Sequence, residues 1–439
     1  MNFDKVFPIP KQVDFIIRRI MDSGGKAYIV GGAVRDLILE RPVNDWDVAT
    51  SFLPDQIESL FSDVRTIPIG KKFGTITVLV DNMPVQVTTF RGEDQYTDFR
   101  HPDNIIFLSD IESDLSRRDF TINAIAFNPY IHPSVIDPMN GLADIDNRLI
   151  RTVGTASCRF AEDPLRMMRA ARFLSQLGFD VETETHNAIK KHASLLLNVS
   201  SERIRDEMDK LLLGDFPYKG LSFLVDVGIF ELIFTTSIFK AMNIKDFSIL
   251  KTIDNSPPDI ILRLAAVFNF VVIPKCIVDH HIITQIIQEI LYRIRYDKQT
   301  IVHVSNIVRK VRNITFSCEH SELAYQLKKL VSMVGKDNTF RIIFIKEIEM
   351  TSTEKKIPPN IANAAHILRE ILGRKEPIHL SDLAITGYDL ISLGIGKNNP
   401  EIIGKLLNLA QEWVLRCPQR NNRNYLLARL QSIIENDNR

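Results

Sequence analysis

Asp45 and Asp47, two aspartates separated by one residue, are the first side chains in this sequence that could do chemistry. On a β-strand, residues i and i+2 point to the same face, which would place the two carboxylates about 7 Å apart. Carboxylate oxygens together with substrate phosphates are the ligands that Mg²⁺ prefers. Two such ions can serve the attacking and leaving oxygens of an in-line displacement. The alternative is that both aspartates are ordinary acids of a turn or a strand edge.

A glycine pair, Gly31-Gly32, precedes these aspartates and lies between an apolar run at 27–30 and a predicted helix. Adjacent glycines let backbone N–H groups approach a phosphate at a helix N-terminus. Arg35 lies one turn into that helix, where it can reach a triphosphate. Tight turns also use glycine, but the combination with Arg35 and the aspartate pair favours a site for a nucleotide phosphate.

A second group of charged residues lies in AEDPLRMMRAARFLSQLGF (161–179). Asp163 and Arg166 are three residues apart, on one face of a helix. A guanidinium only donates hydrogen bonds and a carboxylate only accepts them, so together they can pair with cytosine or adenine. Guanine and uracil present a carbonyl where the amine should be, and are rejected. Arg169 and Arg172 continue this ridge. The alternative is that Asp163 is simply a helix N-cap.

The elements that must position these residues change in character along the chain. The first part mixes strands and helices and predicts an α+β domain with one open sheet. Helices are expected at 12–22, 33–40 and 54–61, and strands at 27–30, 44–50, 64–69, 74–80 and 84–90. Residues 91–104 are polar, lack periodicity and predict a long loop. Beyond about residue 150, apolar residues recur at helical spacing, and the remainder is expected to be all-helical.

Size and composition set broad limits. A chain of 439 residues predicts two to four domains, and its formal net charge of zero means that a nucleic-acid partner needs a local basic surface. The N-terminus has prolines and charges where a signal peptide needs an apolar run, and no stretch reaches about 18 apolar residues. We therefore expect a cytoplasmic protein with no membrane association.

Several sequence motifs, in the same order along the chain, resemble those of a known family. GG-x-VRD (31–36) followed by D-x-D (45–47) is similar to the signature of polymerase-β-like nucleotidyltransferases, in the form shared by class II tRNA nucleotidyltransferases and bacterial poly(A) polymerases. The resemblance continues in LSRRDFTINAIAFNP (115–129), IDPMNGLADI (136–145), the 161–179 segment, SERIRDEMDKLL (201–212) and HLSDLAITGYDLISLGIGKNNPEIIGKLL (379–407). It covers residues 12–234 well and 379–436 moderately.

The resemblance implies a role for each matching residue. Asp45 and Asp47 would be catalytic and hold two Mg²⁺ ions. The nucleotide-binding residues implied are Gly32, Arg35, Arg118, Asp119, Asn123, Asp163, Arg166, Arg169 and Arg172. Gly32, Arg35 and Arg118 would bind the triphosphate. Asp119 and Asn123, on a helix expected to follow Arg118, would recognise the ribose.

The resemblance also implies an architecture and a reaction. A nucleotidyltransferase head (1–143) with a mixed sheet would be followed by a helical neck (144–213), body (214–350) and tRNA-binding tail (351–439). The chain would add CCA to the 3′ end of tRNA from CTP and ATP, releasing pyrophosphate, with no obligate protein partner. Loop residues Glu93, Tyr96, Asp98 and Arg100 favour this over an A-adding-only enzyme or a poly(A) polymerase.

Some positions leave alternatives open. The family's third acid falls by position at Gln86, so either two aspartates suffice or Asp81 or Glu93 substitutes. An RNA-binding relative without chemistry remains a non-enzyme alternative. Arg203 and Glu207, at i and i+4, could form a surface ion pair. Several basic residues near the C-terminus could contact tRNA phosphates: Lys397, Lys405, Arg416, Arg420 and Arg423.

Overall fold

The computed structural model describes residues 7–94, 104–236, 244–354, 357–394 and 400–437. The chain divides into two compact units, Met1–Phe234 and Thr235–Arg439. Below, head and neck keep the limits expected from the sequence, and both lie in the first unit. The finer division into head, neck, body and tail stays a prediction.

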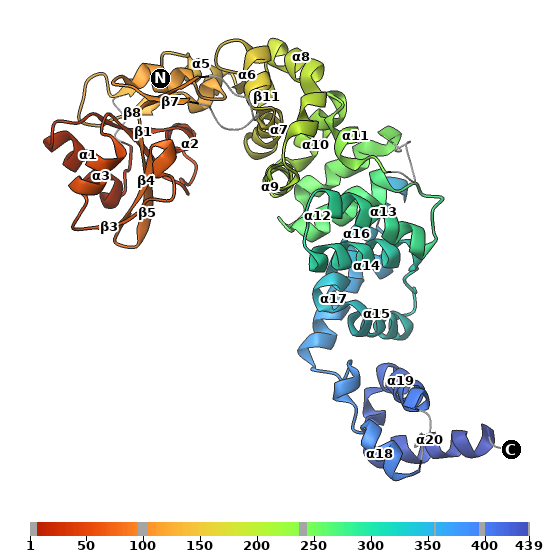
Figure 1. Cartoon of the computed structure of the whole chain (residues 1–439). Helices are drawn as coiled ribbons and strands as arrows, with labels where there is room; N and C mark the ends of the chain where they lie inside the picture. The colour runs from red at the N-terminus through yellow and green to blue at the C-terminus, as the bar shows by residue number, and fades with distance from the viewer. Residues whose placement is uncertain (1–6, 95–103, 237–243, 355–356, 395–399, 438–439) are drawn as a thin grey trace. The chain divides into compact units, whose positions relative to one another are not determined.

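The first unit contains a seven-stranded mixed sheet in the order β3-β4-β5-β2-β1-β8-β9 (Figure 1). Its strands are β1 (Ala27–Val30), β2 (Asp47–Thr50), β3 (Arg65–Ile67), β4 (Thr75–Val80), β5 (Met83–Thr89), β8 (Ala126–Phe127) and β9 (Val135–Ile136). β2 runs parallel to β5 and antiparallel to β1. The mixed sheet followed by helices confirms the predicted α+β class.

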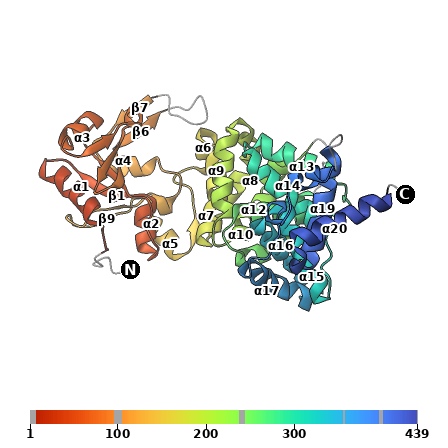
Figure 2. The same cartoon turned by 90° about the horizontal axis from the view of Figure 1, so that it is seen from below.

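Helices cover both faces of this sheet, which explains why β1 is buried along its whole length. Figures 1 and 2 show α1 (Lys11–Asp22) and α3 (Pro54–Leu60) on one side and α2 (Gly32–Ile38) on the other. The four buried residues of α1, Val13, Ile16, Ile17 and Ile20, recur at helical spacing. A second cluster around Phe90 and Leu115 closes the face opposite α1.

Two expected elements differ from the structure near the sheet. The strand expected over 44–50 begins only at Asp47, so Asp45 lies in the preceding connection. The expected loop at 91–104 has strands at both ends, β6 (Arg91–Asp94) and β7 (Asn104–Phe107), which pair with each other. Residues 95–103, with Tyr96, Asp98 and Arg100, lie outside the described residues, as does the Glu93 side chain.

The prediction that one helix carries Asp119 and Asn123 is also wrong. The helix α4 (Ile111–Ser116) ends before Arg117, and only a single 3₁₀ turn, Thr121–Asn123, follows. Asp119 lies between them and accepts a hydrogen bond from the backbone N–H of Phe120 at 2.8 Å. A short polar side chain that bonds to its neighbouring backbone competes with helix formation.

The segment IDPMNGLADI (136–145) packs tightly against that 3₁₀ turn. Asp137 accepts hydrogen bonds from the N–H groups of Gly141 and Leu142 at 2.7 and 2.9 Å, at the start of α5 (Gly141–Asp146). A Cβ atom at Gly141 would lie 2.2 Å from the carbonyl oxygen of Thr121. Only glycine permits this close approach of two backbones.

The helical part of the first unit packs around three adjacent helices in both views (Figures 1 and 2). They are α7 (Leu165–Leu177), α9 (Ser201–Leu212) and α10 (Pro217–Asp226). The remaining helices of this part are α6 (Ala156–Glu162), α8 (Thr183–His192) and α11 (Ile229–Phe234). The expectation of an all-helical chain after residue 150 misses one short strand, β11 (Asp180–Val181), which pairs with β10 (Leu149–Ile150).

The described residues of the second unit form helices and turns, with no strand. The α-helices are α12 (Ile260–Val267), α13 (His280–Arg293), α14 (Lys298–Asn313), α15 (His320–Val334), α16 (Lys336–Glu354), α17 (Pro359–Gly373), α18 (Gly387–Ser392), α19 (Pro400–Arg416) and α20 (Arg423–Asp437). The last three share a small apolar core that includes Leu390, Ala410 and Leu426. Across the described residues, no helix is long and apolar enough to span a bilayer.

Candidate active site

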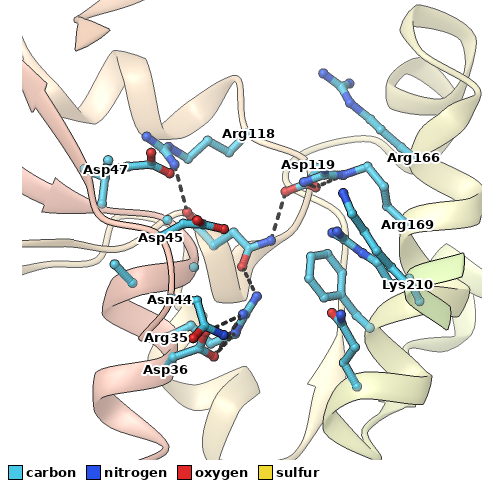
Figure 3. Close-up of a pocket in the computed structure, with 18 of the residues that line it drawn as sticks. Arg35, Asp36, Asn44, Asp45, Asp47, Arg118, Asp119, Arg166, Arg169 and Lys210 are labelled. Atoms are coloured by element: carbon cyan, nitrogen blue, oxygen red, sulfur yellow. Dashed lines mark hydrogen bonds and ion pairs between the residues drawn. The ribbon is translucent and has the colours of Figure 1, made fainter. Parts of the chain in front are cut away.

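A cleft of about 1080 Å³ in the first unit brings the sequence-predicted site residues together. Its walls come from the head and from neck helices α7 and α9 (Figure 3). Every site residue predicted from the sequence lines it: Gly32, Arg35, Asp45, Asp47, Arg118, Asp119, Asn123, Asp163, Arg166, Arg169 and Arg172. Residues that lie more than 100 positions apart in the sequence therefore face one shared space.

The two aspartates of the D-x-D motif differ in environment. Asp45 is exposed in the cleft, whereas Asp47 is half-buried at the start of β2. Burial raises the pKa of Asp47; the nearby Arg118 opposes this effect and the negative charge of Asp45 adds to it. Asp45 and Asp47 bring two negative charges to this wall of the cleft, and Arg118 brings one positive charge beside Asp47. Negative charge therefore exceeds positive charge here.

Gly31 brings its backbone close to this carboxylate pair. It has φ +73°, a left-handed conformation that favours glycine. A Cβ atom here would lie 2.9 Å from Nη1 of Arg118 and 3.9 Å from Oδ2 of Asp47. Gly32 begins α2, so the backbone N–H groups at this helix start open toward the cleft beside Asp47. This supports the reading of the glycine pair as a phosphate turn.

Arg35 is buried and its guanidinium is held by two neighbours. Nε and Nη2 donate to the carboxylate of Asp36 at 2.9 and 3.0 Å, and Nη1 donates to Oδ1 of Asn123 at 2.8 Å. It also lies 5.1 Å from the centroid of the Phe173 ring. Arg35 thus links α2 to the 3₁₀ turn and fixes the orientation of the Asn123 amide.

A buried aspartate that the sequence analysis missed, Asp114, holds the two arginines of the RRD motif. Arg117 and Arg118 form ion pairs with it at 2.8 and 3.2 Å. Burial opposes the ionisation of Asp114, but the two guanidiniums outweigh it and keep its pKa below the ordinary value. The spacing i, i+3 and i, i+4 on and after α4 was the available signal.

Asp119 connects the head to the neck through a buried ion pair. Its Oδ2 accepts from Nε of Arg169 at 2.7 Å, and its Oδ1 accepts from the Asn123 amide at 3.2 Å. Burial alone would raise the pKa of Asp119, but Arg169 and Asn123 hold it well below the ordinary value. Asp119 and Asn123 therefore lie together at the cleft, as the motif predicted, although no helix carries them.

Asp163 and Arg166 both line the cleft, and each forms an ion pair with another charged residue. Asp163 ends α6, accepts from the N–H of Leu165 at 3.1 Å and pairs with Arg203 at 2.8 Å. Arg166 is buried and pairs with Glu162 at 2.6 Å. Pro164, not Asp163, is the N-cap of α7, but the carboxylate of Asp163 still accepts from the N–H of Leu165 in the first turn of that helix.

Arg203 and Glu207 do not form a surface pair with each other as the sequence had allowed. Arg203 pairs with Asp163, while Glu207 is buried and lies 3.0 Å from Nε of Arg172. Their partners are on other elements because α9 packs along α7, a contact that i, i+4 spacing cannot reveal. Helix α9 therefore supports the residues that line the cleft.

Phe173 lies among three of these guanidiniums. The Cζ atoms of Arg172, Arg35 and Arg169 are 4.4, 5.1 and 5.8 Å from its ring centroid. An aromatic face attracts cations through its quadrupole. Burial lowers the pKa of Arg172 to about 10, and the charge of Arg169 adds to this lowering. Arg172 nevertheless remains charged at neutral pH.

Gln86 lies where the sequence placed the missing third acid. It is the direct partner of Asp47 in the parallel ladder between β2 and β5, and it lines the cleft. Asp81 lies instead at the turn between β4 and β5, 3.2 Å from Nζ of Lys11, and is not among the described residues of the cleft. Among described acids, Asp81 therefore does not replace the missing carboxylate.

The C-terminal basic residues divide into two groups. Arg416 pairs with Glu322 at 2.8 Å and Arg423 with Asp389 at 2.6 Å, so both stabilise the second unit. Lys405 and Arg420 have no such pair within the described part of the chain, and Lys397 lies outside it.

Asp279, beside two histidines, caps α13 by accepting from the N–H groups of His281 and Ile282.

Two family models match the chain. Residues 27–151 match the poly A polymerase head domain, and residues 178–237 match the probable RNA- and SrmB-binding site of polymerase A. The first match contains the glycine turn, the D-x-D aspartates and Asp119, and the second contains α9. The order of the matched domains is the order of the motifs.

Curated relatives match about half of the chain. The CCA-adding enzyme of Geobacillus thermodenitrificans is 49% identical over 214 residues, and that of Bacillus pumilus is 47% identical over 216 residues. Each alignment covers 49% of this chain and 52% or 53% of the relative. The chain thus spans about half the length of the curated relatives it matches.

Solved structures match nearly the whole chain. The crystal structure of the Bacillus stearothermophilus CCA-adding enzyme in complex with CTP has a TM-score of 0.75 and 29% identity, covering 97% of this chain and 98% of that one. A Thermotoga maritima CCA-adding enzyme complexed with tRNA has a TM-score of 0.64 at 18% identity, which supports the fold alone. The two matched family models, the curated relatives and the solved structures all agree with the resemblance found in the motifs of this chain.

We predict that Asp119→Asn destabilises the first unit by about 1–3 kcal/mol, because the buried carboxylate of Asp119 is lost and the half-buried Arg169 loses its nearest counter-charge. The chain has two tryptophans, Trp46 and Trp413, and Trp46 is buried in the head. In a Trp413→Phe background, urea unfolding followed by fluorescence therefore reports on the first unit. The depressed pKa makes the contribution of Asp119 present above about pH 4 and lost in stronger acid. The difference should therefore persist from pH 8 to pH 5.

Asp180→Asn is the matched control for this ion pair. Asp180 pairs with Lys219 at 2.6 Å, but its side chain is 75% exposed, so its loss should cost less than about 1 kcal/mol. If the two variants lower the free energy of unfolding equally, the ion pair between Asp119 and Arg169 contributes no more to stability than an exposed pair.

Proposed function

We propose that this chain adds C, C and A to the 3′ end of tRNA from CTP and ATP. The tRNA 3′-hydroxyl attacks the α-phosphate of each nucleotide, and pyrophosphate leaves. The observation that carries the proposal is the shared cleft, in which the carboxylates Asp45 and Asp47 face the neck residues Asp163 and Arg166. Phosphate chemistry and base selection need this proximity, and the names of the relatives support the same reaction.

Asp45 and Asp47 are the residues we expect to hold Mg²⁺, with two ions anticipated. The donor set fits: two carboxylates face the cleft, the amide oxygen of Gln86 is available opposite Asp47, and the charge of Arg118 acts on Asp47. When bound, Mg²⁺ neutralises phosphate charge and polarises the reacting oxygens. The protein then has to bind and orient the nucleotide and the RNA end.

The triphosphate is bound by the glycine turn and by Arg118, in our proposal. Backbone N–H groups at Gly32 supply hydrogen bonds to phosphate oxygens. Arg118 is anchored by Asp114 on one side and lies beside Asp47 on the other, which directs its positive charge toward the phosphates. Arg35 contributes by fixing Asn123, and Asp119 fixes both Asn123 and Arg169 for contact with the ribose.

Base selection falls to Asp163 and Arg166. A side-chain template needs rigid donors and acceptors, because a mobile pair would tolerate the wrong base. Glu162 holds Arg166 and Arg203 holds Asp163, so both templating groups have fixed orientations. Arg169 and Arg172 complete the neck wall next to them. The tail is proposed to contact tRNA, and the cytoplasmic location stays a prediction.

The test is nucleotide addition by the purified chain to tRNAs that end before CCA, after C and after CC, with Mg²⁺. CTP and ATP are supplied separately and together. Ordered addition of C, C and A followed by a stop supports the proposal. Labelling of only the CC-ended tRNA would identify an A-adding enzyme, and unlimited A addition a poly(A) polymerase. No addition to any of the three would leave the RNA-binding reading.

We predict that Arg166→Ala lowers selectivity against UTP and GTP by about tenfold or more, because a charge-assisted hydrogen bond to the base is lost. Binding of Mg²⁺ should be unchanged, since Arg166 lies in the neck. Misincorporation of each nucleotide into the CC-ended tRNA measures the effect. Arg159→Ala is a matched control, because Arg159 also pairs with Glu162 but is not among the described residues of the cleft. Unchanged selectivity in Arg166→Ala would contradict the template assignment.

A second prediction concerns Gln86. In Gln86→Glu, a carboxylate beside Asp47 should lower the Mg²⁺ concentration for half-maximal activity by about tenfold, or ~1.4 kcal/mol. In Gln86→Ala, loss of the amide oxygen should raise that concentration. Titration of activity with Mg²⁺ at saturating CTP compares them. If both variants match the wild type, Gln86 does not face the cation.

A further inference from the structure

Helix α9 presents a stripe of three charged residues to the neck wall. Arg203, Glu207 and Lys210 are spaced i, i+4 and i+7, which places them on one face. The first pairs with Asp163 and the second with Arg172, both on the wall formed with α7. Lys210 is one turn further along and also lines the cleft.

Most positive charges in the cleft already have a carboxylate partner. Eight lining arginines form ion pairs with acids of the same unit: Arg35, Arg41, Arg117, Arg118, Arg166, Arg169, Arg172 and Arg203. Arg91 donates to the carbonyl oxygen of Phe73. These guanidiniums have therefore lost part of their capacity to neutralise an incoming anion.

Lys210 is different. Of the cleft-lining cations that the structure describes, it is the one with no ion pair and no hydrogen bond within the described chain. Figure 3 shows it extending from the neck wall, with Arg35, Asn44 and Asp45 on the opposite wall. An exposed lysine elsewhere is usually solvated without further role, but an ammonium inside a cleft of paired charges meets whatever anion enters there.

We propose that Lys210 binds the outer phosphates of the incoming nucleoside triphosphate. This inference rests on the proposed function, and it adds a phosphate contact from the neck to those from the head. A triphosphate carries several negative charges, of which Mg²⁺ at Asp45 and Asp47 offsets only part. An ammonium is a compact point charge with three donors on a flexible stem, which suits it to binding phosphate oxygens.

The geometry favours the nucleotide over the RNA backbone as the source of the phosphate. Lys210 shares the cleft with Gly32 and Arg118, the residues proposed for the triphosphate, and lies across from the loop that carries Asp45. A nucleotide with its base at Asp163 and Arg166 and its α-phosphate at Asp45 is held between the two walls. Its β- and γ-phosphates then lie within the cleft that Lys210 lines.

Equilibrium binding without RNA tests the inference, because no turnover is then possible. Titration calorimetry with CTP and with CMP, in Mg²⁺, compares the full-length wild type with Lys210→Met and Lys210→Arg. Lys210→Met should weaken CTP binding about tenfold or more and leave CMP binding within about twofold. Lys210→Arg should recover most of the loss. The control is Lys191→Met, since Lys191 is exposed on α8 and does not line the cleft; its CTP affinity should not change.

The outcomes separate this inference from the proposed function. A CTP affinity unchanged in Lys210→Met, or an equal loss for CTP and CMP, would overturn the phosphate contact. A loss confined to tRNA binding would also overturn it, because the phosphate would then belong to the RNA. If the wild type binds CTP and extends tRNA, the proposed function stands in either case. A wild type that does neither overturns both.

Discussion

The buried ion pair between Asp119 and Arg169 is the interaction on which the cleft depends. It joins the segment after α4 in the head to α7 in the neck, and the same aspartate fixes Asn123. Leaving the buried carboxylate of Asp119 without its cation would cost free energy, so the pair favours the arrangement that keeps the two surfaces together. This contact helps to set the distance between the D-x-D aspartates and the residues proposed to select the base, Asp163 and Arg166.

The same constraint explains the many carboxylates around the cleft. Guanidiniums that line one wall repel each other, and burial lowers the pKa of Arg172 further. Pairing with Asp36, Asp114, Glu162 and Glu207 offsets this repulsion and holds them in place. Phe173 adds an aromatic face among three of them. The cleft can therefore present several ordered hydrogen-bond donors although their positive charges repel one another. A cation without such a partner among the described residues, Lys210, is then the informative one.

Motifs predicted the cleft well because they encode local geometry. A strand, a glycine turn and a helix place Gly31 beside Asp47, and strand pairing places Gln86 opposite it. The supporting acids were harder to predict, since the partners of Arg203 and Glu207 depend on how α9 packs against α7. The expected helix at Asp119 and strand at Asp45 failed for a related reason. Both residues bear functional side chains on irregular backbone, where tertiary contacts outweigh local propensity.

The residues proposed to select the base and those proposed to hold the metal therefore lie on different secondary-structure elements. Asp45 and Asp47 depend on the sheet of the head, whereas Asp163 and Arg166 depend on α6, α7 and the charged face of α9. A substitution in α9 can thus alter which base fits while leaving the carboxylates in place. Both supports meet at the ion pair between Asp119 and Arg169, which also holds Asn123. If the proposed roles hold, this ion pair couples the residues proposed to select the base to those proposed to act on the phosphate.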